Sequence, residues 1–294
     1  MRRDRDLYAP EFWWDHRRRG GRRLRHRYAR GVCNSPGGGG KSMSRNDRQS
    51  TPSDMAEDLF HPGDVALSQP EMNTFKNKLA TFMDLSFRLG PNVLAPRKET
   101  ELLAKVCIER LSKGPARPRV IDMCCGCGNL AIAIAHQIRD ADVWACDLTA
   151  DTVAVAWNNV LRYELQNRVT VVQGDMFENI RNIGLEGQVD LVMCNPPYIS
   201  TGRLNGDRAH LLDSEPREAF DGGPYGISIQ QRLVREALDF LKPGGWLAFE
   251  FGHGQERQAA SMITRTKAYS EVLFVLDPNG IPRVAITTKL ASPL

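Results

Sequence analysis

The sequence contains no uninterrupted apolar stretch that approaches the length of a membrane span, which predicts a protein without a membrane segment. Its first thirty residues also lack the apolar core of a secretory signal. A disulfide framework is not indicated, because the seven cysteines are odd in number and four of them abut or lie in apolar strand-like runs. We therefore expect reduced thiols and a cytoplasmic location. The cysteines are Cys33, Cys107, Cys124, Cys125, Cys127, Cys146 and Cys194.

Two ligand classes find little support in the sequence. Cys124, Cys125 and Cys127 are close together, but no second cluster of cysteine or histidine completes a tetrahedral metal site, so we expect no metal. The net charge of +4 is uneven: residues 1–42 hold eleven arginines and one lysine against four acids, and residues 43–294 hold 27 basic and 31 acidic residues. The body of the chain therefore lacks a general electrostatic attraction for nucleic acid.

Residues 1–58 contain little apolar material and are rich in arginine, glycine and polar side chains, with four consecutive glycines from Gly37 to Gly40. Such a segment cannot bury enough surface to fold, so we predict a disordered tail. Three interpretations stay open. The tail binds RNA or acidic partners, or it is a solvated arm without a role, or it lies upstream of a true start at Met43 or Met55.

The segment that follows the tail, residues 59–98, is predicted to form a short helical arm. Its apolar residues are spaced closely enough to pack one face of a helix. They are Leu79, Phe82, Met83, Leu85, Phe87 and Leu89.

Short apolar runs then alternate with amphipathic segments across residues 99–294. This alternation predicts an α/β domain built on a doubly wound, mostly parallel seven-stranded sheet. The turn sequence at residues 277–280 joins the last two strands and predicts an antiparallel hairpin at the sheet edge. The predicted helices are 99–113, 128–139, 150–165, 228–241 and 254–267, and the predicted strands are 118–123, 142–147, 169–173, 189–194, 245–251, 271–276 and 282–288.

The first predicted strand leads into a helix through a turn that contains glycine. Asp122 lies near the end of the strand, and Gly126 and Gly128 lie in the turn, where the missing Cβ lets the backbone pass close to a ligand. Open α/β sheets bind ligands at this end of their strands. Asp122 could bind an ammonium group of such a ligand, directly or through water. A tight turn with no ligand is the alternative that these residues leave open.

Acidic residues follow the next two predicted strands. Asp147 ends the second strand, 19 residues after Gly128, where an acid can accept hydrogen bonds from both ribose hydroxyls of a nucleoside. Asp175 and Met176 follow the third strand, so the acid can accept from an adenine amino group and the methionine can pack on the ring. A helix N-cap remains open for Asp147, and a plain loop acid remains open for Asp175.

The fourth predicted strand ends in Asn195, Pro196, Pro197 and Tyr198. The Asn195 side chain and the Pro196 backbone each offer a carbonyl, and neither proline nitrogen can donate, so the turn is rigid and rich in acceptors. Two acceptors can hold both N–H bonds of a planar amide or aminopurine, and Tyr198 can pack an aromatic ring against that group. A strand-to-loop turn stiffened by proline is the alternative.

These motifs resemble the class I S-adenosylmethionine-dependent methyltransferases, and more closely the protein-(glutamine-N5) methyltransferases of the HemK/PrmC family, which modify release factors. The resemblance covers about residues 90–288. Residues 93–101 (Val-Leu-Ala-Pro-Arg-Lys-Glu-Thr-Glu) and 215–223 (Glu-Pro-Arg-Glu-Ala-Phe-Asp-Gly-Gly) carry it most selectively. Further matches lie in 241–246 and at Glu250-Phe251-Gly252, Gln255, Asp277 to Gly280 and Arg283.

The resemblance implies a Rossmann-like fold, S-adenosyl-L-methionine as the methyl donor and a glutamine side-chain nitrogen as the acceptor. Arg97 and Thr100 would then shape the approach to cofactor and substrate, unless their segment only caps helix 99–113. Glu215 and Arg217 would brace the catalytic loop. The implied catalytic residues are Asn195, Pro196, Pro197 and Tyr198, and the implied cofactor-binding residues are Asp122, Cys124, Gly126, Gly128, Asp147, Asp175, Met176 and Asn195.

The sequence departs from the family at two places. Cys124 stands where the family has the first glycine of its cofactor turn. Family members also carry a helical domain before the Pro-Arg segment, used to recognise the release factor, and this sequence offers only residues 59–98 there. The catalytic resemblance survives these departures, so the expected partner is still a release factor-like protein. The short segment before the Pro-Arg motif leaves a small molecule, or an amino group of adenine or guanine in nucleic acid, as alternatives. A cofactor-binding scaffold without activity is the non-enzymatic alternative.

Overall fold

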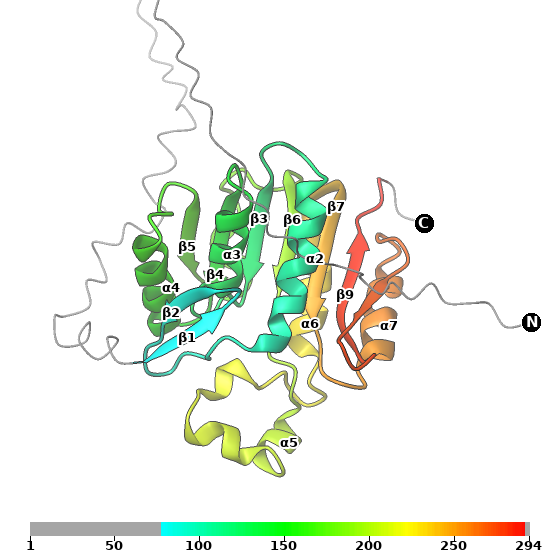
Figure 1. The fold of residues 1–294 in the computed structure, drawn as a ribbon. Helices are drawn as coiled ribbons and strands as arrows, with labels where there is room; N and C mark the ends of the chain where they lie inside the picture. The colour runs from blue at the N-terminus through cyan, green and yellow to red at the C-terminus, as the bar shows by residue number, and fades with distance from the viewer. Residues whose placement is uncertain (1–77, 292–294) are drawn as a thin grey trace, which may run out of the picture.

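The structure is a computed structural model that describes residues 78–291. A seven-stranded sheet forms its centre, in the order β5-β4-β3-β6-β7-β9-β8, and the first five strands in that order are parallel (Figure 1). The fold prediction is confirmed, including the antiparallel edge formed by the last two strands. The strands are β3 (Arg119–Met123), β4 (Asp142–Asp147), β5 (Val169–Gln173), β6 (Val189–Cys194), β7 (Leu241–Glu250), β8 (Leu273–Leu276) and β9 (Pro282–Thr288).

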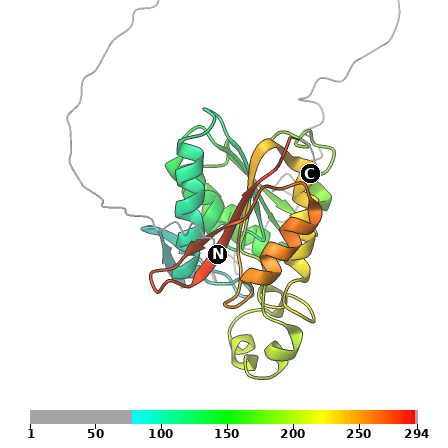
Figure 2. The same ribbon diagram turned by 90° about the vertical axis from the view of Figure 1, so that its right-hand side faces the viewer.

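Helices cover both faces of the sheet (Figure 2). Alternate residues of a strand serve the two faces: Val120 packs with α2, α3 and α4, whereas Ile121 packs with α6 and α7. Strands that are buried on both faces read as continuous apolar runs, which is why the sequence located them well. The helices are α2 (Glu101–Ser112), α3 (Asn129–Gln137), α4 (Ala150–Arg162), α5 (Thr201–Asn205), α6 (Ser228–Phe240) and α7 (Glu256–Thr266).

The direction of winding changes between β3 and β6. From β3 the chain proceeds to β4 and β5 on one side, and it returns to place β6 and β7 on the other side. Such a switch point opens a crevice at the carboxyl ends of the two central strands, where α/β sheets bind ligands. The segment from the end of β6 to α6 projects from this same edge and contains α5, at the bottom of Figure 1.

The helical arm predicted for residues 59–98 is wrong over residues 79–88, which form an antiparallel hairpin of β1 (Leu79–Phe82) and β2 (Leu85–Arg88). Met83 and Asp84 make the two-residue turn with positive φ of 48° and 63°, as the favoured hairpin turns require. The alternation of apolar residues through the second strand has the period of a strand, which the helical interpretation overlooked. The predicted tail, residues 1–58, and the start of the arm lie outside the described residues.

Hydrogen bonds attach the hairpin to α4 and to Tyr163, the residue that directly follows α4. The Tyr163 hydroxyl accepts from the Ser86 backbone N–H at 2.7 Å and donates to the Ser86 carbonyl at 2.9 Å. The Asn159 side chain accepts from the Arg88 N–H at 2.8 Å and donates to its carbonyl at 2.9 Å. The same Asn159 amide donates to the Cys127 carbonyl at 3.0 Å, so the hairpin, α4 and the turn after β3 form one unit. Among the described residues no helix has the length and apolarity to cross a membrane.

Candidate active site

Two cavities at the carboxyl edge of the sheet meet at Asn195. One has a volume of about 530 Å³ and is lined by residues that follow β3, β4 and β5. The other has a volume of about 810 Å³ and lies between the loop after β6 and the ends of β7 and β9. Asn195, Leu94 and Ala219 line both cavities. The arrangement suits a reaction in which two molecules enter from different sides and react at the shared wall.

The turn after β3 contains three left-handed residues. Gly126 and Gly128 have φ of 58° and 81°, and Cys124 has φ of 57° although it carries a side chain. A Cβ on Gly126 would meet no atom within 4 Å, and Gly126 lines the 530 Å³ cavity. Gly128 instead packs close to Ala156 of α4, at 3.5 Å from a built Cβ. The two expected glycines therefore have different tasks: one opens the cavity wall, and the other brings α3 against α4.

Asp147 lines the 530 Å³ cavity at the end of β4, where the sequence placed it. Its Oδ2 accepts from the Gly126 N–H at 2.9 Å, and its Oδ1 accepts from the Leu148 N–H at 2.8 Å. Burial raises the pKa of Asp147, and the backbone donors partly offset that rise. The carboxylate thus holds the glycine turn while facing the cavity, which is the position required of a ribose acceptor.

Asp122 lies behind the turn rather than on the cavity wall. It is fully buried, its Oδ2 accepts from the Ala131 N–H at 2.9 Å, and its Oδ1 has no hydrogen-bond partner among the described residues. Burial raises the pKa of Asp122 well above its ordinary value. This position supports a brace for the start of α3, and binding of a ligand's ammonium group, directly or through water, stays a prediction.

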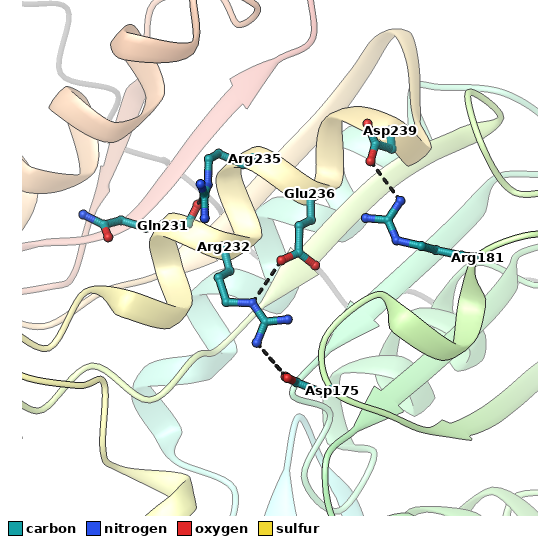
Figure 3. Close-up of polar contacts among 7 residues, drawn as sticks. All are labelled: Asp175, Arg181, Gln231, Arg232, Arg235, Glu236 and Asp239. Carbon is teal, nitrogen blue, oxygen red and sulfur yellow. Dashed lines mark hydrogen bonds and ion pairs between the residues drawn. The ribbon is translucent and has the colours of Figure 1, made fainter.

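Asp175 and Met176 line the 530 Å³ cavity after β5. The Arg232 guanidinium on α6 donates to both carboxylate oxygens of Asp175, at 2.7 and 2.9 Å, and to Glu236 at 3.0 Å (Figure 3). A second ion pair, between Arg181 and Asp239 at 3.0 Å, ties the same two segments together. The sequence does not predict the contact with Arg232, because nothing near Arg232 marks it as a partner of Asp175.

Asn195 is the first residue after β6, and its side chain is held in one direction. Its Nδ2 donates to the Thr100 hydroxyl at 3.0 Å, and that hydroxyl donates to Oε2 of Glu250 at 2.8 Å. The Asn195 Oδ1 is buried and has no hydrogen-bond partner among the described residues. A buried carbonyl without a donor, at the meeting point of two cavities, is a prepared acceptor for a ligand N–H.

Tyr198 faces the 810 Å³ cavity and is joined to Glu250 and Arg283. Its hydroxyl donates to Oε1 of Glu250 at 3.3 Å and accepts from Arg283 at 3.4 Å, and the guanidinium lies 5.9 Å from the ring centroid. Burial, with Glu250 nearby, raises the pKa of Tyr198 to about 12. The tyrosine therefore stays neutral near pH 7 and offers an aromatic surface rather than a base. The two prolines separate the cavities: Pro196 lines the larger, and Pro197 lines the smaller.

A second loop packs directly on the Asn-Pro-Pro-Tyr segment. The Gly222 N–H donates to the Ile199 carbonyl at 2.8 Å, and the Gln255 amide donates to the carbonyls of Tyr198 and Gly226 at 3.0 and 3.1 Å. The backbones approach so closely that a Cβ on Gly226 would lie 2.5 Å from the Tyr198 oxygen. The sequence marks Glu250, Gln255 and Arg283 only as members of the family's segments and indicates no role for any of them.

The remaining expected residues lie in loop-to-loop contacts around the site. Glu215 pairs with Arg97 and accepts from the Ala95 N–H at 3.0 Å, and Arg217 contacts Asp221 at 3.3 Å. Arg97 lines the 810 Å³ cavity, and Arg217 lines the 530 Å³ cavity. Across the part of the chain that the structure describes, no group of His, Cys, Asp or Glu is arranged to hold a metal ion.

The chain is similar to known methyltransferases. Residues 89–218, which include the glycine turn and Asn195, match the family described as Methyltransferase small domain. The release factor glutamine methyltransferase of Moorella thermoacetica is 38% identical over 203 residues, covering 69% of this chain and 69% of that protein. The release factor glutamine methyltransferase of Geobacter sulfurreducens is 36% identical over 203 residues, covering 69% and 68%. In fold, the N-terminal domain of human METTL16 in complex with SAH aligns with a TM-score of 0.51 at 16% identity, over 71% of this chain and 76% of that chain. The chain belongs to the release factor glutamine methyltransferase family.

Proposed function

We propose that this protein transfers a methyl group from S-adenosyl-L-methionine to the side-chain N5 of a glutamine in a protein of the release factor class. The observation that carries the proposal is the Asn195 carbonyl, which is buried and lacks a donor among the described residues, on a residue that lines both cavities. Membership of the family supports the choice of a glutamine amide as the acceptor.

The 530 Å³ cavity fits the cofactor. Asp147 would accept from the ribose hydroxyls, and Met176 would pack on the adenine ring. Asp175 would accept from the adenine amino group, with Arg232 fixing its carboxylate. Gly126 leaves room for the ligand because no Cβ projects there. The bound cofactor supplies a methyl group activated by a sulfonium.

The substrate amide would be held by two acceptors. The Asn195 Oδ1 and the Pro196 carbonyl would each accept one N–H, and Tyr198 would pack against the flat amide. Accepting both hydrogens favours the partial positive charge that grows on the nitrogen during transfer. A general base is not required before transfer, because the N–H becomes acidic as the new bond forms. Alignment of this kind contributes roughly 7–11 kcal/mol in favourable cases.

The size of the 810 Å³ cavity supports a peptide segment as the acceptor. Residues from several segments of the chain line it, among them Leu94, Tyr225 and Arg283. The formal surplus of acidic residues in the body of the chain gives no comparable support to a nucleic acid acceptor.

The test is transfer of labelled methyl from S-adenosyl-L-methionine to a purified class 1 release factor, with mixed RNA and a small-metabolite extract offered in parallel. Label on the release factor, located on one glutamine by mass spectrometry and lost when that glutamine is replaced, is the expected result. Label that appears only in the RNA or metabolite fraction would overturn the assignment of the acceptor. A catalytic control is Asn195→Ala, which should reduce turnover by about 10²–10³-fold, the effect typical of removing one preorganised hydrogen-bonding group.

A further inference from the structure

The direction of the Asn195 amide is set by two residues from distant parts of the chain. We propose that Thr100 and Glu250 act together as a positioning pair, which turns the Asn195 carbonyl toward the substrate and keeps the NH₂ group away from it. The inference rests on the proposed function, because the direction matters only if the ligand presents an N–H. Neither residue touches the reacting atoms in this arrangement, so both act through Asn195.

The pair fixes the direction of the Asn195 amide because a carboxylate can accept hydrogen bonds but cannot donate them. An amide and a hydroxyl each have a donor and an acceptor, so an asparagine next to a threonine could face either way. The Glu250 Oε2 takes the single hydroxyl hydrogen of Thr100, at 2.8 Å. The Thr100 oxygen is then left to accept, and the group that donates to it is the Asn195 Nδ2 at 3.0 Å. The Asn195 Oδ1 therefore points away from Thr100, and Asn195 lines both cavities.

The anchor of this chain of hydrogen bonds is fixed on the sheet. Glu250 ends β7 and is 2% exposed, and its Oε1 accepts from Tyr198 and from Arg283, both at 3.3 Å. Arg283 comes from β9, which pairs with β7 next to Glu250. Thr100, which is 2% exposed, immediately precedes α2. The three parts are thus held by separate elements, which leaves little freedom for the amide to turn over.

A purely structural role for the pair would depend on the shape of the Glu250 side chain, whereas the proposed role depends on its being only a hydrogen-bond acceptor. Glu250→Gln separates these two possibilities, because it keeps the side-chain shape and replaces one acceptor oxygen by a donor NH₂ group. Tyr198 and Arg283 both donate to the Oε1 side, so the new carbonyl belongs there and the NH₂ group faces Thr100. The Thr100 hydroxyl hydrogen has then lost its acceptor, and it regains one when the Asn195 carbonyl turns toward Thr100. The NH₂ group of Asn195 now faces the substrate NH₂, and the acceptor is lost.

The experiment compares Glu250→Gln, Thr100→Val, Thr100→Ser and the double variant Thr100→Val/Glu250→Gln, with kcat at saturating cofactor and substrate, the Kd of S-adenosylhomocysteine and the melting temperature as readouts. Glu250→Gln should lower kcat by about 100-fold while the Kd changes less than about 3-fold, as expected when a hydrogen bond that stabilises the transition state is removed. Thr100→Val should also lower kcat, and Thr100→Ser, which keeps the hydroxyl, should recover most of that loss. In the double variant the losses should not multiply, because Glu250 acts through Thr100.

A second measurement needs no substrate. In the unliganded protein, nuclear Overhauser effects should join the Asn195 side-chain NH₂ protons to the Thr100 methyl group, and Glu250→Gln should remove them. A wrong acceptor would abolish the activity readout in the wild type and leave these effects in place, so the two failures are distinguishable. The positioning role is overturned if Glu250→Gln retains wild-type kcat, if the two losses multiply in full, or if the nuclear Overhauser effects survive the substitution. If Thr100→Val does not fold, Glu250→Gln and the nuclear Overhauser effects still decide the matter.

Discussion

Gly226 offers a sharp test of how closely the catalytic loop must be held. Its φ is +68°, and a Cβ placed on it would lie 2.5 Å from the Tyr198 carbonyl oxygen and 2.9 Å from the Ser200 backbone nitrogen. Both approaches are to backbone atoms of the segment that carries Asn195, so no flexible side chain can yield to the added atom. Gly226→Ala must therefore move the loop, the catalytic segment or both.

The expected loss of stability in Gly226→Ala has two parts, and a comparison with Gly244→Ala separates them. A side chain in the left-handed region costs about 1–2 kcal/mol wherever it stands. Gly244 has φ of +81° and a Cβ there would meet nothing within 4 Å, so Gly244→Ala carries this cost alone. It lies near the start of β7, at the end of the sheet opposite the site. Gly226→Ala adds an overpacking cost of about 1–3 kcal/mol, part of which the protein can relieve by shifting Tyr198.

The assay is kcat at saturating cofactor and substrate, together with the melting temperature of both variants. A shift of about 1 Å in a catalytic group can cost about 100-fold in rate, so Gly226→Ala should lose about that much. Gly244→Ala should lose stability and keep kcat within about 3-fold, because the common left-handed cost of about 1–2 kcal/mol arises far from the site. Equal kcat values for the two variants would refute the claim that this loop holds Tyr198 and Asn195 in register.

Three further predictions concern the cofactor turn and the pH dependence. Asp147→Ala should weaken S-adenosylhomocysteine binding by about 10–100-fold in calorimetry, since it removes a charged acceptor and frees the Gly126 N–H, and unchanged affinity would contradict the ribose assignment. Cys124→Gly should raise the free energy of unfolding in urea by about 1 kcal/mol, because Cys124 has φ of 57°, which disfavours any side chain. A free energy of unfolding below that of the wild type would mean that the Cys124 side chain stabilises the turn by more than the backbone strain costs. Burial raises the pKa of Glu250, whose charged and polar neighbours are Thr100, Tyr198 and Arg283. The positioning role needs the ionised carboxylate, so kcat should rise as the pH rises through that raised pKa. Glu250→Gln, which cannot ionise, should lack this step in the pH profile. The folded state binds the proton more tightly than the unfolded state, so the stability of the wild type relative to Glu250→Gln should fall as pH rises from the ordinary glutamate pKa to the raised one.

The fold could be predicted because its strands are buried on both faces. A run such as residues 189–194 is entirely buried, and it is apolar except for Asp190, which marks it without any knowledge of its neighbours. The hairpin at residues 79–88 was missed because it is short and only partly buried, so its alternating pattern was weak evidence against a helix. Besides the burial of Phe82 and Phe87, it is held by hydrogen bonds to Tyr163 and to Asn159 on α4, which no local pattern could reveal.

The sequence predicts which candidate site residues lie at the edge of the sheet better than it predicts which residues they contact. Asp147 and Asp175 line the cavity because both follow parallel strands, which must end at one edge of the sheet. Asp122 lies near the end of a parallel strand too, but it is fully buried and accepts from the Ala131 N–H of α3, a contact that the sequence pattern does not contain. Arg232 reaches Asp175 from 57 residues away, and such a contact depends on how α6 is placed relative to the loop after β5 rather than on either local sequence.

The orientation of Asn195 is the clearest case of a property that a motif does not contain. The tetrapeptide provides an amide at the right place, but the hydrogen bonds that turn it reach Thr100, 95 residues away, and from there Glu250, 150 residues away. With Gln in place of Glu250, the chain would keep Asn-Pro-Pro-Tyr intact and present a donor where the reaction needs an acceptor. In the proposed mechanism the motif is therefore necessary and not sufficient. The single hydrogen that Thr100 gives to Glu250 would decide the activity, because it determines which end of the Asn195 amide the substrate meets.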